Sequence, residues 1–209
     1  MLYLHGTAKN LSAHFQRVAW LPSAGINVFA LDYRGYGDSD GLPSVAGAEL
    51  DIDTAMRTLL SRSDVDPERI CIFGQSLGGA LAIYYVAHSA YRAHIRAVIA
   101  DSPFADYRLI AQERMDSLAI TRPLDWLPAL LVDDKYSPSA AVAALSPIPL
   151  LLIHGARDAV IGPHHSKLLL QKAEQPKDFR IVPGAGHIEA IDSPLVRQHR
   201  TSFLLEHCG

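Results

Sequence analysis

Apolar positions along the chain follow two alternating patterns. Short, nearly continuous apolar runs are typical of strands buried on both faces of a parallel sheet. They predict strands at residues 1–6, 27–32, 70–73, 96–101, 149–155 and 179–184. Between them, apolar residues recur at helical spacing, which predicts helices at residues 10–21, 49–62, 77–86, 165–173 and 194–207. Strands that alternate with helices predict an α/β fold, with a mostly parallel sheet of about six strands covered on both faces.

The stretch RICIFGQSLGGALAIYYVAH, residues 69–88, passes from predicted strand to predicted helix without a linker. Ser76 stands at this corner, between Gly74 and Gly78. Because glycine has no Cβ, strand and helix can approach closely there, and the turn lifts the serine hydroxyl toward the positive end of the helix. G-x-S-x-G in a strand–turn–helix setting is typical of a nucleophile elbow. A purely structural turn is the alternative interpretation.

Composition narrows the functional classes. The 209 residues are 49% hydrophobic and 20% charged, which indicates a soluble globular domain. The net charge is −3 and no basic block occurs, which argues against nucleic acid as a partner. No apolar stretch approaches the roughly 18–20 residues of a membrane span. Cys71 and Cys208 are too few for a disulfide scaffold or a zinc site, and Cys71 is predicted to be a small core residue.

Polar residues with catalytic potential follow the predicted strands. Ligands of parallel sheets bind beyond the carboxyl ends of the strands, where the sequence places His5, Asp32, Ser76, Asp101, Asp158 and His187. A serine hydroxyl needs an adjacent base to become a good nucleophile, histidine suits that role, and a carboxylate orients the imidazole. The chain offers Ser76, Asp158 and His187 in the order associated with α/β-hydrolases.

Five motifs in sequence order, HGTAKN, DYRGYGDSDG, GQSLGG, HGARDAVIG and PGAGH, together resemble the α/β-hydrolase superfamily. The closest similarity is to its serine-hydrolase branch of protein depalmitoylases, lysophospholipid and monoacylglycerol lipases, and serine-aminopeptidase-like hydrolases. The resemblance implies a three-layer α/β-hydrolase fold without metal or cofactor. It also implies a Ser76 nucleophile, a His187 base and an Asp158 acid. The oxyanion hole would be formed by the backbone N–H of Leu77 and by a second backbone N–H. The second would come from Thr7 or, as the less favoured alternative, from Ala8.

Some residues keep two interpretations. Asp101 ends the strand after the nucleophile unit, where some hydrolases of this superfamily carry their acid, and it competes with Asp158. The loop that holds Asp32, Arg34 and Asp38 could contact substrate, but a structural loop tied by an Arg–Asp pair is the favoured interpretation.

The segment 102–148 is too long for a plain loop and holds no predicted strand. By analogy with the superfamily, it is expected to form a cap, whereas residues 1–101 and 149–209 form the hydrolase core. Its apolar residues, among them Trp126 and Leu127, could line an acyl pocket or simply pack the cap onto the core. An apolar acyl group in the substrate is therefore favoured, but the sequence does not distinguish ester, thioester and amide.

These features predict a serine hydrolase that cleaves an ester or thioester of a small molecule or an acylated protein. A serine peptidase and a non-catalytic binding protein of the same fold are the alternatives. Members of the superfamily usually carry two further strands, and often a membrane anchor, before the strand that begins here at Met1. Without such strands, the strand at 27–32 would be an exposed apolar edge, which predicts a homodimer or an upstream covering segment. A cytoplasmic location is expected.

Overall fold

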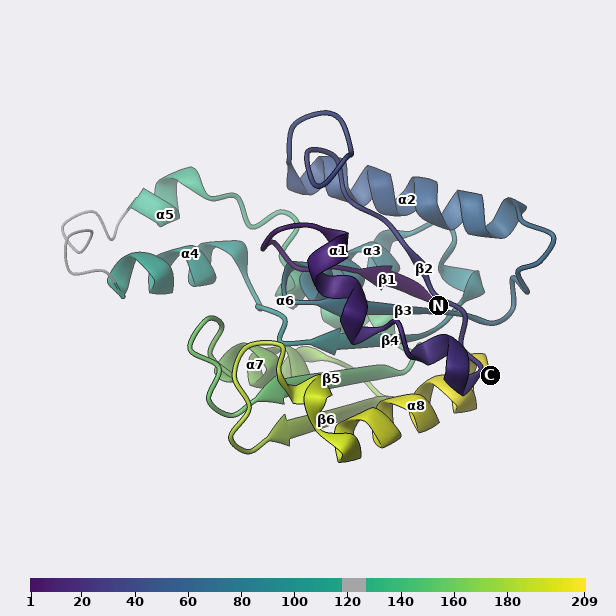
Figure 1. Ribbon diagram of the computed structural model, residues 1–209. Helices are drawn as coiled ribbons and strands as arrows, with labels where there is room; N and C mark the ends of the chain where they lie inside the picture. Colours follow the sequence, from purple (N-terminus) through teal and green to yellow (C-terminus); the bar gives the residue numbers. More distant parts are fainter. Residues whose placement is uncertain (118–126) are drawn as a thin grey trace.

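The computed structural model describes residues 1–117 and 127–209. Its centre is a six-stranded parallel sheet with the strand order β2-β1-β3-β4-β5-β6 (Figure 1). The strands are β1 (Leu2–Leu4), β2 (Phe29–Ala30), β3 (Ile70–Gln75), β4 (Ile95–Asp101), β5 (Leu150–Gly155) and β6 (Lys177–Val182). The predicted α/β fold class is confirmed.

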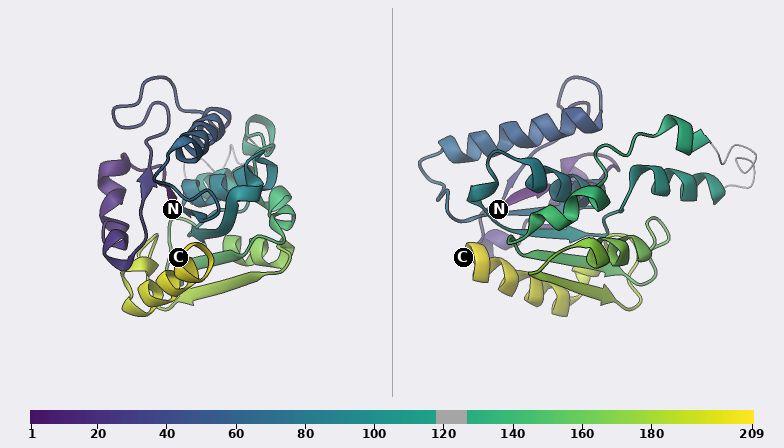
Figure 2. Two further views of the ribbon diagram at one scale, coloured as in Figure 1. Left: turned by 90° about the vertical axis from the view of Figure 1, so that its right-hand side faces the viewer. Right: turned by 180° about the vertical axis from the view of Figure 1, so that it is seen from behind.

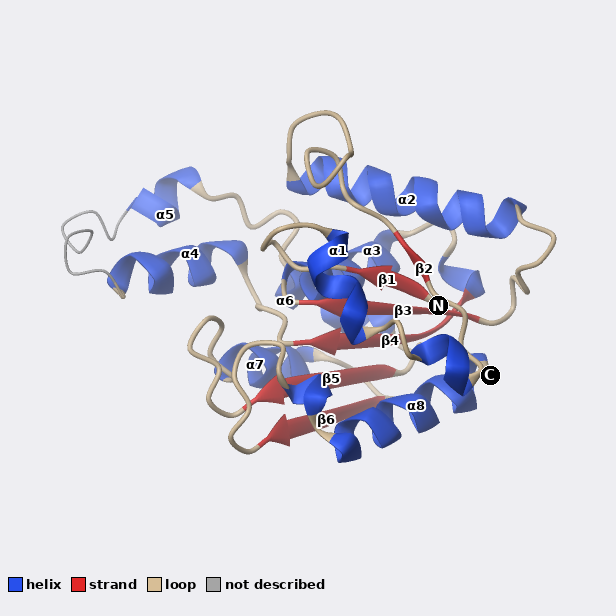
Figure 3. Cartoon of the chain, viewed as in Figure 1, coloured by secondary structure: helices blue, strands red, loops and turns tan. Residues whose placement is uncertain are grey.

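Helices cover both faces of the sheet (Figures 2 and 3). The described helices are α1 (Leu11–His14), α2 (Val45–Ser61), α3 (Leu77–His88), α4 (Tyr107–Asp116), α5 (Leu127–Leu131), α6 (Pro138–Ala141), α7 (His164–Lys172) and α8 (Pro194–Cys208). Short 3-10 turns are η1 (Phe15–Arg17), η2 (Leu21–Ala24), η3 (Arg92–His94), η5 (Val142–Leu145) and η6 (Ala190–Asp192). The prediction of one continuous helix at 10–21 is wrong, because α1 has four residues and is followed by the 3-10 turns η1 and η2.

Alternate side chains of each strand enter two separate cores, as the pleat requires. In β3, Ile70 and Ile72 pack under α2 and α3, whereas Cys71 and Phe73 face α8. Strands β3 and β5 are buried along their whole length. Burial on both faces explains why these strands are continuous apolar runs in the sequence.

The segment between β4 and β5 divides into two parts. Figures 1 and 2 show α4 and α5 projecting beyond the carboxyl ends of the strands. In contrast, α6 and η5 pack against α3. Val142 and Leu145 of η5 are buried there, in the core that also contains Ile70 and Ile72 of β3. No helix in the described ranges is long and apolar enough to cross a membrane.

The edge strand β2 is shorter than predicted. It contains only Phe29 and Ala30, which pair with β1, and no strand of the described chain pairs with its outer edge. A very short edge strand exposes few unpaired backbone groups, which is one way in which proteins limit edge-to-edge association.

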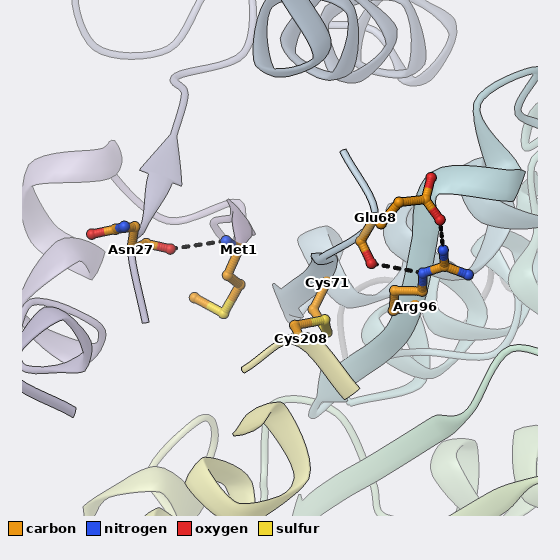
Figure 4. Close-up of a disulfide and its surroundings, with 6 residues drawn as sticks. All are labelled: Met1, Asn27, Glu68, Cys71, Arg96 and Cys208. Carbon is orange, nitrogen blue, oxygen red and sulfur yellow. Dashed lines mark hydrogen bonds and ion pairs between the residues drawn. A yellow bond between two sulfur atoms is a disulfide. The ribbon is translucent and has the colours of Figure 1, made fainter. Parts of the chain in front are cut away.

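Cys71 and Cys208 form a disulfide that the sequence analysis did not predict (Figure 4). Cys71 is buried in the core as expected, near the start of β3, and Cys208 ends α8. Their sequence separation of 137 carries no spacing signal. Only the packing of α8 across the sheet brings the two thiols together.

We expect reduction of this disulfide to lower the melting temperature. In the chain-entropy account, a bridge that closes so long a loop contributes about 2–5 kcal/mol. For a chain of this size, that corresponds to a decrease of roughly 5–15 °C in melting temperature. Calorimetry with and without dithiothreitol measures the effect. Cys208→Ser should melt like the reduced wild type and should not respond to the reductant. Equal melting temperatures for oxidised and reduced wild type would contradict the prediction.

Candidate active site

Ser76 occupies a sharp turn between β3 and α3. Its backbone angles are φ 55° and ψ −119°, a conformation that non-glycine residues seldom adopt. A Cβ on Gly74 would collide with the Gly78 carbonyl, and a Cβ on Gly78 would collide with the Leu4 carbonyl. The two glycines therefore allow the close strand–helix approach that the motif predicts.

The structure brings His187 and Asp158 to this serine. His187 lies in the loop after β6, and its Nε2 is 3.1 Å from Ser76 Oγ. Its Nδ1 is 2.8 Å from Oδ2 of Asp158, which lies in the loop after β5. Both distances are within hydrogen-bond range, so the hydroxyl, imidazole and carboxylate form one continuous line.

The surroundings of Asp158 favour its charged form. Burial alone would raise the pKa of this carboxyl, but hydrogen bonds from His154, His187 and the Ile161 N–H outweigh it and hold the pKa well below its usual range. Oδ1 accepts the N–H groups of Val160 and Ile161 at 2.8 Å each. A carboxylate that is charged at neutral pH can fix the imidazole tautomer and stabilise a positive charge on it.

Asp101 faces other partners. Its Oδ2 accepts a hydrogen bond of 2.8 Å from Gln75 Nε2, and its Oδ1 accepts one of 3.3 Å from Ser102 Oγ. Burial raises the pKa of Asp101, an effect that Gln75 and Arg200 oppose. Of the two competing carboxylates, only Asp158 contacts His187 in the described structure.

A cavity of about 420 Å³ opens beside Ser76. Its wall is mainly apolar and includes Tyr33, Tyr36, Pro43, Val45, Ala48, Leu81, Phe104, Tyr107, Ile110, Val160 and Ile161, together with Thr7, Arg34, Ser44, Leu77 and Arg114. Three wall residues, Tyr107, Ile110 and Arg114, come from one face of α4. Sequence analysis missed them, although their spacing of three and four residues is a signal for one helical face.

Of the two expected cap residues, Leu127 alone lies within the described structure. Leu127 begins α5 and does not line the cavity. Trp126 lies outside the described residues. The expected substrate contact of Leu127 therefore receives no support from the cavity wall, and that of Trp126 stays a prediction.

Thr7 and Leu77 both line the cavity next to Ser76. Leu77 is the first residue of α3, so its backbone N–H has no acceptor within the helix. The helix dipole also favours negative charge at this end. The position suits stabilisation of an oxyanion.

The DYRGYGDSDG loop is tied by an Arg–Asp ion pair, and its aspartate comes from outside the loop. Arg34 pairs with Asp51 of α2, with Nη2 and Oδ1 2.8 Å apart. Asp32 instead accepts the Leu11 N–H at 2.6 Å and lies 3.1 Å from His5 Nε2. The structural interpretation holds for Asp32, whereas Arg34 both anchors the loop and lines the cavity.

One cluster has the composition of a metal site. Glu113 of α4 contacts His164 Nε2 at 2.7 Å and His165 Nε2 at 3.0 Å. However, His165 Nδ1 accepts the Ala105 N–H at 3.1 Å. In neutral His165 the proton must then sit on Nε2, where a metal would need a free lone pair. The cluster is better explained as a set of polar contacts that holds α4 against α7.

Comparisons with known proteins identify the family and the fold of the chain. Residues 12–209 match the model of the prolyl oligopeptidase family. The YfhR protein of Escherichia coli O157:H7, itself uncharacterized, is 41% identical over 208 residues, which are 98% of this chain and 69% of YfhR. The α/β hydrolase domain-containing protein 17B of Xenopus laevis is 32% identical over 90% of this chain and 59% of its own. The esterase Pf2001 of Pyrococcus furiosus superposes with a TM-score of 0.77 at 21% identity, covering 100% of this chain and 80% of the esterase.

Proposed function

The chain belongs to the prolyl oligopeptidase family and has the α/β-hydrolase fold, and we propose that it is a serine hydrolase. Its substrate would be a carboxylic ester or thioester with an apolar acyl group. The observation that carries the proposal is the imidazole of His187, which lies within hydrogen-bond range of both Ser76 Oγ and Asp158 Oδ2.

The proposed reaction has two steps. As Ser76 Oγ attacks the acyl carbon, His187 Nε2 takes the hydroxyl proton and then gives it to the leaving alcohol or thiol. The backbone N–H groups of Leu77 and Thr7 hold the oxyanion, which is worth about 2.7–4 kcal/mol per donor in a measured case. In the second step, His187 takes a proton from water as the water oxygen attacks the acyl carbon. The bond from that carbon to Ser76 Oγ then breaks, the acid leaves, and His187 returns the proton to Oγ.

The cavity supports an apolar acyl group. Tyr107 and Ile110 of α4 line it together with Leu81 and Ile161 of the core, and no acidic residue is among the described lining residues. We therefore propose that α4 and α5 form the part of the 102–148 segment that acts as a cap.

An acyl-ester series tests this proposal. Fluorophosphonate labelling of one sample tests for a reactive serine. On separate, unlabelled enzyme, p-nitrophenyl esters from acetyl to dodecanoyl and aminoacyl p-nitroanilides are compared by kcat/KM. We expect ester hydrolysis to exceed anilide hydrolysis, and Ile110→Trp, which narrows the cavity, to shift the optimum to shorter chains. Leu109→Trp is the matched control, because Leu109 lies on the same helix outside the cavity wall. Preference for anilides would favour a peptidase, and absence of labelling a non-catalytic protein.

Oligomeric state and location stay predictions. The homodimer expected from the sheet edge would have to pair through β2, which has two residues. Light scattering on the purified chain measures the oligomeric state. A cytoplasmic location requires that Cys71 and Cys208 be reduced in the cell, because cytosolic thiols are kept reduced. Thiol trapping before lysis distinguishes the two redox states.

A further inference from the structure

Buried polar side chains connect the residue before the candidate nucleophile with the residue after the candidate base. Gln75 Nε2 donates a hydrogen bond of 2.8 Å to Asp101 Oδ2. Asp101 Oδ1 accepts one of 3.3 Å from Ser102 Oγ, and the same Oγ accepts the Ile188 N–H at 3.3 Å. These hydrogen bonds therefore form a continuous chain from β3 across β4 to the loop after β6, and we call it the Gln75–Ser102 chain.

The directions of these hydrogen bonds are determined by their partners. Tyr3 donates its hydroxyl to Gln75 Oε1 at 2.6 Å, which leaves the amide NH₂ of Gln75 for Asp101. Ser102 has one hydroxyl proton, which it donates in the hydrogen bond to Asp101. A lone pair of Oγ is therefore free to accept the Ile188 N–H. Gln75, Asp101 and Ser102 are at most 1% exposed. Water cannot readily replace a missing member of this chain.

The peptide after His187 is held in a conformation that its side chain disfavours. Ile188 has a φ of 51°, and Ser102 has a φ of 53°. A β-branched residue at positive φ is an outlier, and such strain persists only where the surroundings enforce it. Around Ile188, the enforcing contacts are the Ser102 hydroxyl on its N–H and the Arg17 guanidinium on its carbonyl oxygen.

We propose that Ser102 is a positioning residue, whose hydroxyl holds the Ile188 peptide and thereby keeps His187 Nε2 within reach of Ser76. This inference rests on the proposed hydrolase function. Loss of the hydroxyl would leave a buried N–H without an acceptor and free the strained peptide to relax. His187 would then move away from the 3.1 Å contact with Ser76 Oγ.

Two substitutions separate positioning from stability. Ser102→Gly removes the hydroxyl and also relieves the positive φ, whereas Ser102→Ala removes the hydroxyl alone. We expect both to lower kcat by about 10- to 100-fold, because a misplacement on the order of 1 Å has effects of that size. KM should stay unchanged, since Ser102 does not line the cavity. The glycine variant should melt at or above the temperature of the alanine variant.

Ser137→Ala is the matched control. Ser137 is also buried, accepts a backbone N–H from Tyr107 at 3.0 Å and donates to the Asp134 carboxylate at 2.8 Å. We expect it to lose stability as Ser102→Ala does, with kcat unchanged. Equal kcat losses in the control and in Ser102→Ala would overturn the proposal.

Hydrogen exchange tests the same inference independently of activity. In Ser102→Gly, the peptide that contains Ile188 should exchange faster than in wild type. Unchanged exchange, or faster exchange with kcat within twofold of wild type, would refute the positioning role. If wild type does not react with a fluorophosphonate at Ser76, the hydrolase proposal itself fails, and the exchange result still shows whether Ser102 holds the loop.

Discussion

Ser76→Ala should abolish fluorophosphonate labelling and ester hydrolysis while leaving the fold intact. The hydroxyl is the only group at the elbow that can form the acyl-enzyme in the proposed reaction, and His187 Nε2 lies 3.1 Å from it. Losses of about 10⁶-fold in kcat accompany removal of the serine in a well-studied hydrolase. Alanine keeps the Cβ, so the packing of the turn should change little. Labelling, steady-state kinetics and circular dichroism measure the three outcomes.

The control for this substitution is Ser61→Ala. Ser61 ends α2 on the exposed surface, where its hydroxyl donates a hydrogen bond to the Thr58 carbonyl oxygen. This variant should label and hydrolyse esters like wild type. If Ser76→Ala were labelled as strongly as wild type, the nucleophile would be a different residue.

Asp158→Asn should lower kcat by about 10⁴-fold, the size of the effect when the corresponding aspartate of a serine protease is replaced. Asparagine has no charge to stabilise the imidazolium of His187 and can present an N–H where a carboxylate oxygen accepted one. KM should change little, because Asp158 does not line the cavity. Steady-state kinetics on the preferred ester measures the loss.

Asp101→Asn is the matched comparison, since it is the other buried aspartate at a strand end. It should mainly lower the melting temperature, with a far smaller loss in kcat, because Asp101 contacts Gln75 and Ser102 rather than His187. If Asp101→Asn were the slower enzyme with its melting temperature unchanged, Asp158 would not be the acid.

The low pKa of Asp158 also predicts how it contributes to stability. Its folded pKa lies below the unfolded value, so the folded state binds fewer protons and is favoured above pH 4 or so. This contribution is lost as the pH falls further toward the folded pKa. Wild type should therefore lose more stability than Asp158→Asn between about pH 5 and pH 3, which calorimetry at each pH measures.

Local sequence patterns were sufficient for the sheet and the elbow. The strands β3 and β5 are buried on both faces, so nearly every residue in them is apolar and the runs are unmistakable. Gly74 and Gly78 leave a signature because any side chain there would collide with backbone four or more residues away. The carboxyl ends of parallel strands share one edge, which is why polar residues after separate strands could be grouped into one site.

Tertiary structure decided what depends on contacts between distant segments. Asp101 and Asp158 both follow strands, and only the path of the loop after β6 places His187 against Asp158. The cavity wall is made of residues from α4 and from the core, which are distant in the sequence. Cys71 and Cys208 are separated by 137 positions, and no motif indicates that they pair. The Gln75–Ser102 chain was likewise invisible, because its members gain their roles from neighbours across the sheet. Sequence periodicity reports which face of an element is buried, whereas partner choice depends on how those elements pack in space.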